Sequence, residues 1–186
     1  MKHELWYSVV VRDRHGKVIS RERRRSRSFL KQWNQLVYVQ MAQTSLSIKD
    51  TGGTSRSIDP IGTNFKMKAD AGNSNYGIRV GTGTTAVAID DYALETPIAH
   101  GTGAGQMSHL VCTVATSVVA APSCSFLVSR SIVNNSPGVI TVREAAIYMR
   151  MDDSYYGCAV RDVLTVPQAV PNGGAITIDW TIQVTV

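Results

Sequence analysis

Apolar and polar residues alternate along the last third of the chain. The alternation runs through residues 139–150, 158–170 and 175–186. A period of two is typical of strands that bury one face. The tetrapeptide Pro-Asn-Gly-Gly at 171–174 supplies residues that accept a positive φ in a tight reversal between the last two runs. These segments predict antiparallel strands of a β-sandwich or barrel.

The apolar positions of these runs predict the core of the protein. A shift of one residue in register would exchange the two faces of a strand, so the assignment depends on the register of each run. The predicted core residues are Val142, Ala146, Tyr148, Val160, Val163, Ile176, Ile178 and Trp180.

The first 44 residues predict two further elements. Residues 1–23 are predicted to form a β-hairpin, because alternating runs at 5–12 and 17–23 flank an Asp-Arg-His-Gly turn. Within 27–44 apolar residues recur at spacings of three and four, which predicts an amphipathic helix that lies against a sheet. Ser26 or Ser28 is the expected N-cap of this helix.

Residues 45–77 are rich in Ser, Thr, Gly, Asn and Asp and show no sustained period. They predict a long loop with at most one short strand at 64–68. Ordering such a segment costs on the order of 1 kcal/mol per residue, and it has few apolar side chains to offset that cost. We therefore expect the loop to be mobile in the free subunit and ordered in an assembly.

The whole chain, 1–186, is predicted to form a single domain. Its main sheet strands are expected within 78–186, including segments 107–120 and 123–133, and a short strand at 76–80 precedes them. The predicted fold is mainly β, an antiparallel β-sandwich (jelly-roll-like) with one amphipathic helix and a long loop. A length of 186 residues suits one domain with a substantial core.

Composition narrows the class of protein. With 44% hydrophobic and 18% charged residues, the chain has the balance of an ordinary globular protein. No run of about 18 uncharged apolar residues predicts a membrane helix, and charges interrupt the N-terminus before a signal-peptide pattern could form. Three cysteines without a Cys-x-x-Cys spacing predict buried, reduced thiols. We expect the protein to be made in the cytoplasm.

Positive charge is concentrated at the start of the chain. Residues 1–31 carry ten Lys or Arg against three acidic residues, a balance of +7, whereas residues 32–186 carry nine against eleven, a balance of −2. The candidate partner-binding residues are Arg21, Arg23, Arg24, Arg25, Arg27 and Lys31. They could meet an acidic protein partner, bind nucleic acid with Trp6, Tyr7 and Trp33 as stacking platforms, or form a solvated face.

Motifs with catalytic or cofactor chemistry are weak in this sequence. Residues 81–86, Gly-Thr-Gly-Thr-Thr-Ala, match a dinucleotide fingerprint, but no helix pattern follows and no acidic residue stands about 20 positions on. His100 and His109 have no third metal ligand at a suitable spacing. We therefore predict a loop at 81–86, no cofactor, no metal and no enzymatic activity.

Two blocks of the chain together resemble a known group of proteins. The first, residues 78–98, reads IRVGTGTTAVAIDDYALETPI; the second consists of ITVREAAIYM at 140–149 followed by residues 159–186, which begin with AVRDV and end in a last strand. In this order they resemble small virion proteins of tailed bacteriophages, with tail-collar and tail-fibre-like β-domains. The hairpin and the Arg-Ser-Phe helix start also resemble this group.

The resemblance implies a non-enzymatic structural component of the virion. It implies a closed ring or other symmetric oligomer of this chain. We expect this oligomer to dock on other virion proteins at the tail or the head-tail (neck or collar) region. A capsid decoration protein is the alternative within the same class. A nucleic-acid-binding module that uses the basic segment from Arg21 to Lys31 is the alternative from another class.

Overall fold

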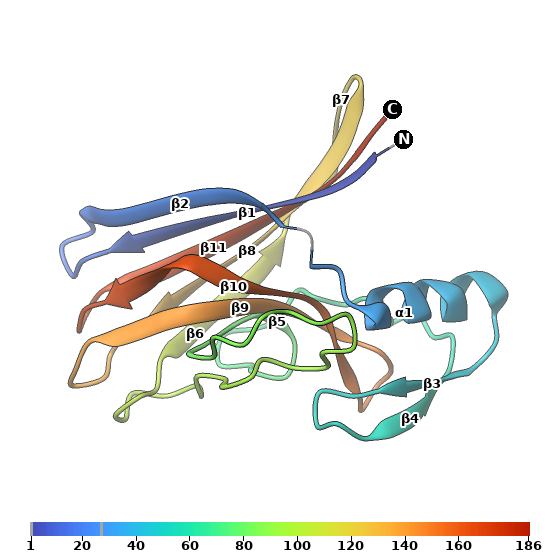
Figure 1. Ribbon diagram of the computed structural model, residues 1–186, viewed down its shortest axis with the longest axis horizontal. Helices are drawn as coiled ribbons and strands as arrows, with labels where there is room; N and C mark the ends of the chain where they lie inside the picture. Colours follow the sequence, from blue (N-terminus) through green and yellow to red (C-terminus); the bar gives the residue numbers. More distant parts are fainter. Residues whose placement is uncertain (1, 27) are drawn as a thin grey trace.

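The computed structural model describes residues 2–26 and 28–186, and its architecture is mainly β, with 52% strand and 7% helix. Two antiparallel sheets face each other in a sandwich-like arrangement, and a helix and a small hairpin lie at one end (Figure 1). The predicted fold class is confirmed. In chain order the elements are β1 Lys2–Arg12, β2 Val18–Ser26, α1 Lys31–Ala42, β3 Leu46–Lys49, β4 Ser55–Ile58, β5 Gly77–Gly81, β6 Ser108–Val114, β7 Val118–Ala120, β8 Ser123–Val133, β9 Ile140–Arg150, β10 Tyr156–Val170 and β11 Ala175–Thr185.

The larger sheet has the strand order β2-β1-β11-β8-β6, with β7 paired to β8 at one end. The first and last strands of the chain are neighbours, and they pair from Lys2 opposite Thr185 to Arg12 opposite Ala175. The smaller sheet has the order β10-β9-β5. In the part of the chain that the structure describes, every ladder between these strands is antiparallel.

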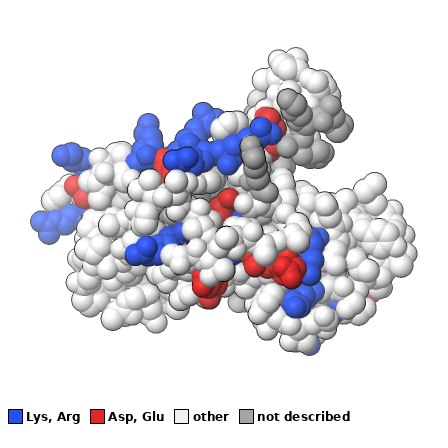
Figure 2. Space-filling view, in the orientation of Figure 1, with Lys and Arg blue, Asp and Glu red and all other residues white. Residues whose placement is uncertain are grey.

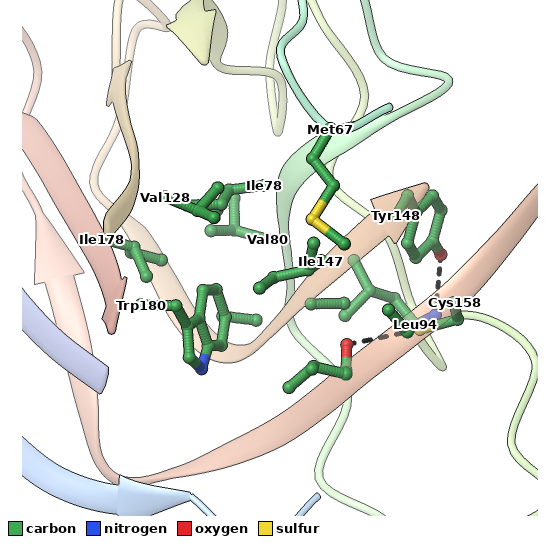
Figure 3. Close-up of a cluster of buried hydrophobic side chains, with 14 of the residues drawn as sticks. Met67, Ile78, Val80, Leu94, Val128, Ile147, Tyr148, Cys158, Ile178 and Trp180 are labelled. Carbon is green, nitrogen blue, oxygen red and sulfur yellow. Dashed lines mark hydrogen bonds between the residues drawn. The ribbon is translucent and has the colours of Figure 1, made fainter. Parts of the chain in front are cut away.

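The core lies between the two sheets. Trp180, Ile178 and Val128 of the larger sheet lie near Ile78 and Ile147 of the smaller one, and all five are fully buried (Figure 3). Alternate residues of each strand therefore meet across the sandwich, as the period-two pattern predicts. Seven of the eight predicted core residues are buried.

Val163 is the exception among the predicted core residues, since it is half-buried while its neighbour Leu164 is buried. The register of β10 against β9 shifts twice, between Cys158 and Val160 and between Val163 and Gln168. A bulge changes which residues face the core, so strict alternation cannot be carried through this strand.

The N-terminal hairpin is confirmed. The side chain of Asp13 holds the turn, because its Oδ1 accepts from the backbone N–H of His15 at 2.8 Å and of Lys17 at 3.0 Å. Gly16 has a φ of +80°, a conformation that glycine adopts without steric cost. β2 continues to Ser26, three residues beyond the predicted end.

The helix is shorter than predicted, and neither serine is its N-cap. α1 begins at Lys31 after the capping position Leu30, whereas the prediction was 27–44. Ser26 and Ser28 instead donate their hydroxyls to the two carboxylate oxygens of Asp162, each at 2.6 Å. The serines thus bind the end of β2 to β10 rather than starting a helix.

Residues 45–77 are not an extended loop. β3 and β4 form a hairpin within them, and no strand is found at the predicted 64–68. Ile48, Ile58, Met67 and Ala69 are buried, so the segment is packed by its own domain. The hairpin was not predicted, and its apolar side chains belong to the core cluster; the expected mobility of the segment in the free subunit stays a prediction.

The prediction of buried thiols holds for two of the three cysteines. Cys112 and Cys158 are buried, whereas Cys124 is half-buried, and all three are free thiols. Across the described residues, no helix has the length and apolar character required to cross a membrane.

Candidate functional site

Three of the six candidate basic residues lie together on one face of the larger sheet. Arg21, Arg23 and Arg25 are all exposed, and alternation along β2 places them on the outer face of the larger sheet. Figure 2 shows basic side chains gathered along this edge of the molecule. In β1 the residue opposite Arg25 is Trp6, which lies on the same face. We call Arg21, Arg23, Arg25 and Trp6 the basic face.

Contacts within the basic face hold two of its arginines in place. The guanidinium of Arg23 lies over the ring of Trp6, 5.5 Å from the ring centroid. Arg25 Nη2 lies 3.2 Å from Glu4 Oε1. A flat cation beside an indole ring suits both nucleobases and the side chains of a protein partner.

The other candidates do not join this face. Arg24 belongs to the opposite face of β2, where its Nε donates to Glu22 Oε1 at 2.8 Å. Glu22 is buried and also accepts from the hydroxyl of Tyr7. Lys31 begins α1 and is half-buried. Arg27 lies outside the described residues.

A buried ion pair forms a second site, on the outer side of the smaller sheet. Glu144 of β9 and Arg161 of β10 have side chains exposed by 0% and 2%, and Glu144 Oε2 accepts from Arg161 Nε at 2.9 Å. Arg161 Nη1 donates to Asp91 Oδ2 at 2.8 Å, and Nη2 donates to the carbonyl of Thr85 at 3.1 Å. Glu95 Oε2 lies 3.7 Å from Nη2.

The carboxylate of Glu144 also binds the backbone of the glycine-rich segment. Its Oε1 accepts from the N–H groups of Gly83 at 3.1 Å and Thr96 at 2.8 Å, and its Oε2 accepts from the N–H of Glu95 at 3.1 Å. A Cβ on Gly83 would lie 2.6 Å from Glu144 Oε1, so only glycine allows this approach. We call Glu144, Arg161, Asp91 and Glu95 the clasp.

Glu95 completes the binding of the glycine-rich segment. Its Oε2 accepts from the N–H groups of Thr84 at 2.7 Å and Thr85 at 2.8 Å. The hydrogen bond from the Thr85 N–H is the largest cause that holds the pKa of Glu95 below its usual range. The N–H groups of residues 83–85, which resembled a phosphate cradle, thus bind carboxylates of this chain.

The segment 82–98 is fixed to the smaller sheet at a further point. The N–H of Leu94 donates to the hydroxyl of Tyr148 at 2.8 Å (Figure 3). Burial is the main cause that raises the pKa of Tyr148 above its usual range, so the hydroxyl stays protonated. The clasp and Tyr148 together hold the segment against β9 and β10.

Sequence reasoning did not identify Glu144 and Arg161 as site residues. The sequence signal was weak, because each residue stands between one apolar and one charged neighbour: Ala145 and Arg143 for Glu144, and Val160 and Asp162 for Arg161. A buried charge is rarely found without a partner of opposite sign. The distance along the chain, from Gly83 to Arg161, hid which residues those partners were.

The two histidines considered as metal ligands lie together. The ring centroids of His100 and His109 are 5.6 Å apart, and His100 Nδ1 accepts from the backbone N–H of His109 at 3.1 Å. Burial, with smaller contributions from nearby Arg79, Arg130 and His100, lowers the pKa of His109 to about 3. Among the described residues, no group of three His, Cys, Asp or Glu side chains is arranged to hold a metal ion.

An extension of the larger sheet is the third feature. β7, the start of β8 and the adjacent ends of β1 and β11 project beyond the rest of the molecule (Figure 1). We call residues 114–122 the arm. Val118 and Val119 of the arm are exposed by 60% and 77%, so large apolar side chains face solvent there.

Comparison with known proteins identified no relative. No family, no curated protein and no solved structure matches the chain.

Proposed function

We propose that this chain is a structural component of a tailed-phage virion, at the tail or head-tail region, and that it acts by self-assembly and by docking on other virion proteins. The clasp is the observation that carries the proposal. It joins the two blocks on which the resemblance rests: Gly83 and Glu95 come from the first block, and Glu144 and Arg161 come from the second. Blocks that were separate in sequence therefore form one structural unit.

The chemistry of the clasp supports a structural role for these blocks. The oxygen atoms of Glu144 accept from three backbone N–H groups and from Arg161. An ion pair whose donors and acceptors are all engaged fixes a surface segment in one conformation. Such a segment presents a defined surface to a neighbouring subunit.

The arm supplies a surface for self-assembly. Exposed apolar side chains beside a sheet edge are an interaction surface, since pairing with another chain would bury both the side chains and the free backbone groups. Val118 and Val119 meet both conditions. The other edge of the larger sheet carries the basic face, which suits an acidic partner.

Mass spectrometry of purified phage particles and of isolated tails tests the proposal. We expect the chain in intact particles and in isolated tails. Its absence from both would contradict the virion proposal. Its presence on heads alone, and not on tails, would favour a capsid decoration protein instead.

Nucleic-acid binding is a second candidate, favoured by the contact of Arg23 with Trp6. Duplex DNA held by the three arginines of the basic face would show a log-log salt slope of about −3. Changing Arg21, Arg23 and Arg25 to Gln should then abolish retention of DNA. A control with the same loss of charge changes the exposed Lys66, Lys68 and Arg143 to Gln. Equal effects of the two triple variants would show unspecific charge attraction.

A further inference from the structure

A pocket of about 410 Å³ lies between the turn of the β3–β4 hairpin, the turn before β5 and the segment that the clasp holds. Its floor includes Tyr148 and Tyr156, and Tyr92 stands at its side. A volume of this size is within the range of small-molecule sites in proteins. Arg79 of β5 supplies the charged side chain of its wall.

Arg79 is buried without a counter-charge. The residue is exposed by 8%. Its guanidinium donates to two backbone carbonyls: Nη1 donates to Ser74 O, and Nη2 donates to Ile98 O at 3.3 Å. Its Nε has no hydrogen-bond partner. Among the described residues, no carboxylate forms an ion pair with it. Its guanidinium carbon also lies 5.7 Å from the centroid of the Tyr148 ring, a cation–π contact.

The other buried arginines show how unusual this environment is. Arg161 has the carboxylates of the clasp. Arg130 is also without a carboxylate, but its guanidinium donates to four carbonyls, and its Nε is satisfied by Leu110 O at 2.7 Å. Arg79 has fewer acceptors and an unsatisfied Nε. Burial of a guanidinium that has no carboxylate partner and an unpaired Nε is energetically unfavourable, and a bound anion would offset this cost.

The other residues that line the pocket determine which kind of anion fits it. Thr51, Ser74 and Asn75 provide hydroxyl and amide groups that both donate and accept. Tyr92 and Tyr156 provide aromatic faces against which a ring can pack. A ligand that matches all of these groups carries a carboxylate, several hydroxyls and a ring.

We propose that this pocket binds a small acidic sugar, a hexuronate, with its carboxylate on Arg79, its hydroxyls on the polar wall of Thr51, Ser74 and Asn75, and its ring against Tyr92 or Tyr156. A planar guanidinium is the protein group that best recognises a carboxylate. The proposal does not depend on the chain being a virion component, because the pocket is complete within one subunit.

Titration of the full chain with two matched sugars tests the proposal. D-galacturonate and D-galactose differ only at C6, where the first has a carboxylate and the second a hydroxymethyl group. Binding is followed by the amide signals of residues 51–52, 74–75 and 92–96 in NMR spectra. We expect saturable shifts with galacturonate and affinity at least about tenfold weaker for galactose, the loss that a charged hydrogen bond predicts. Absence of saturable shifts, or equal affinity for both sugars, would overturn the proposal.

Two variants locate the site. Arg79→Gln should reduce the affinity for galacturonate by about 10- to 100-fold, whereas the exposed Arg143→Gln, with the same change of charge, should leave it unaltered. Tyr92 is 38% exposed, so Tyr92→Ala tests the pocket without disturbing the buried arginine. It should weaken galacturonate several-fold. Unchanged affinity in folded Arg79→Gln or in Tyr92→Ala would place the sugar elsewhere and overturn the proposal.

Discussion

At the scale of single residues, the pair Glu144–Arg161 is the contact on which the outer layer of the smaller sheet depends. A buried ion pair gains little net stability over an apolar pair, because both ions lose their hydration. Removal of one partner lowers stability much more, because it leaves the other ion buried without a counter-charge. Glu144 in addition accepts hydrogen bonds from three backbone N–H groups, which its removal would leave without this acceptor.

We expect Glu144→Ala to lower the free energy of unfolding by about 3–5 kcal/mol, the cost typical of breaking a buried pair. Urea denaturation followed by circular dichroism measures the change. Arg143→Ala, at the neighbouring exposed position, is the control and should remain within about 0.5 kcal/mol of the wild type. Similar losses in the two variants would show that the clasp does not hold the segment 82–98.

His109 should make the protein sensitive to acid. Its folded-state pKa of about 3 lies below the ordinary 6.5, so between these values the unfolded chain binds more protons than the folded one. The contribution is fully present above pH 6.5 and is lost as the pH falls toward 3, with a slope of up to about 1.4 kcal/mol per pH unit. His109→Leu should flatten the fall in unfolding free energy over this window, measured by urea denaturation at several pH values.

An exposed histidine gives the matched control for that measurement. His15 lies in the exposed turn of the N-terminal hairpin. His15→Gln should keep the acid dependence of the wild type. If His109→Leu and the wild type fell in parallel between pH 6.5 and 3, the burial of a neutral His109 would not be the cause of the acid sensitivity.

At the scale of elements, sequence periodicity located the strands well and the irregular elements poorly. The C-terminal strands and the N-terminal hairpin followed from alternation and from turn residues at 13–16 and 171–174. The β3–β4 hairpin was missed because each of its strands has four residues and contributes one fully buried apolar side chain, Ile48 or Ile58. Hydrophobic periodicity cannot be recognised over four residues when most of the surrounding residues are polar.

The helix start and the clasp were missed for a different physical reason. Serine before an apolar run predicts an N-cap only when its hydroxyl is free, and Asp162 already engages both Ser26 and Ser28. The clasp likewise joins residues between 17 and 76 positions apart in sequence. Long-range polar contacts of this kind leave no periodic signal in a single sequence.

Limited proteolysis distinguishes the arm from the segment that was predicted to be a loop. We expect proteinase K to cut the isolated protein first within the arm, residues 114–122, because its strand β7 is exposed and pairs on one side only. Residues 45–77 should be cut later, since they are packed through Ile48, Ile58 and Met67. Mass spectrometry of the early fragments identifies the first site. First cleavage within 45–77 would show that the hairpin is not stably packed.

At the scale of the whole molecule, the two edges of the larger sheet differ in character. The β2 edge carries arginines, and charged side chains discourage pairing of an edge with another strand. The β6–β7 edge carries apolar side chains instead, including Leu110, Val111, Val118 and Val119, all of them exposed. A sheet with one protected edge and one apolar edge is suited to directional association, and this asymmetry is the physical basis for the proposed self-assembly.

We therefore expect the wild-type chain to be an oligomer and the double variant Val118→Lys/Val119→Lys to be a monomer. Two lysines on an edge strand repel each other, and the contact between subunits would lose the apolar area that the two valines bury. Size-exclusion chromatography with light scattering measures the mass. The free energy of unfolding of the monomer should change by less than about 0.5 kcal/mol, because both sites are exposed.

Val139→Lys/Val166→Lys, at exposed valines away from the arm, is the control and should keep the wild-type mass. A monomeric wild type, or an arm variant of unchanged mass, would show that the arm does not join subunits, and association would then have to use another surface.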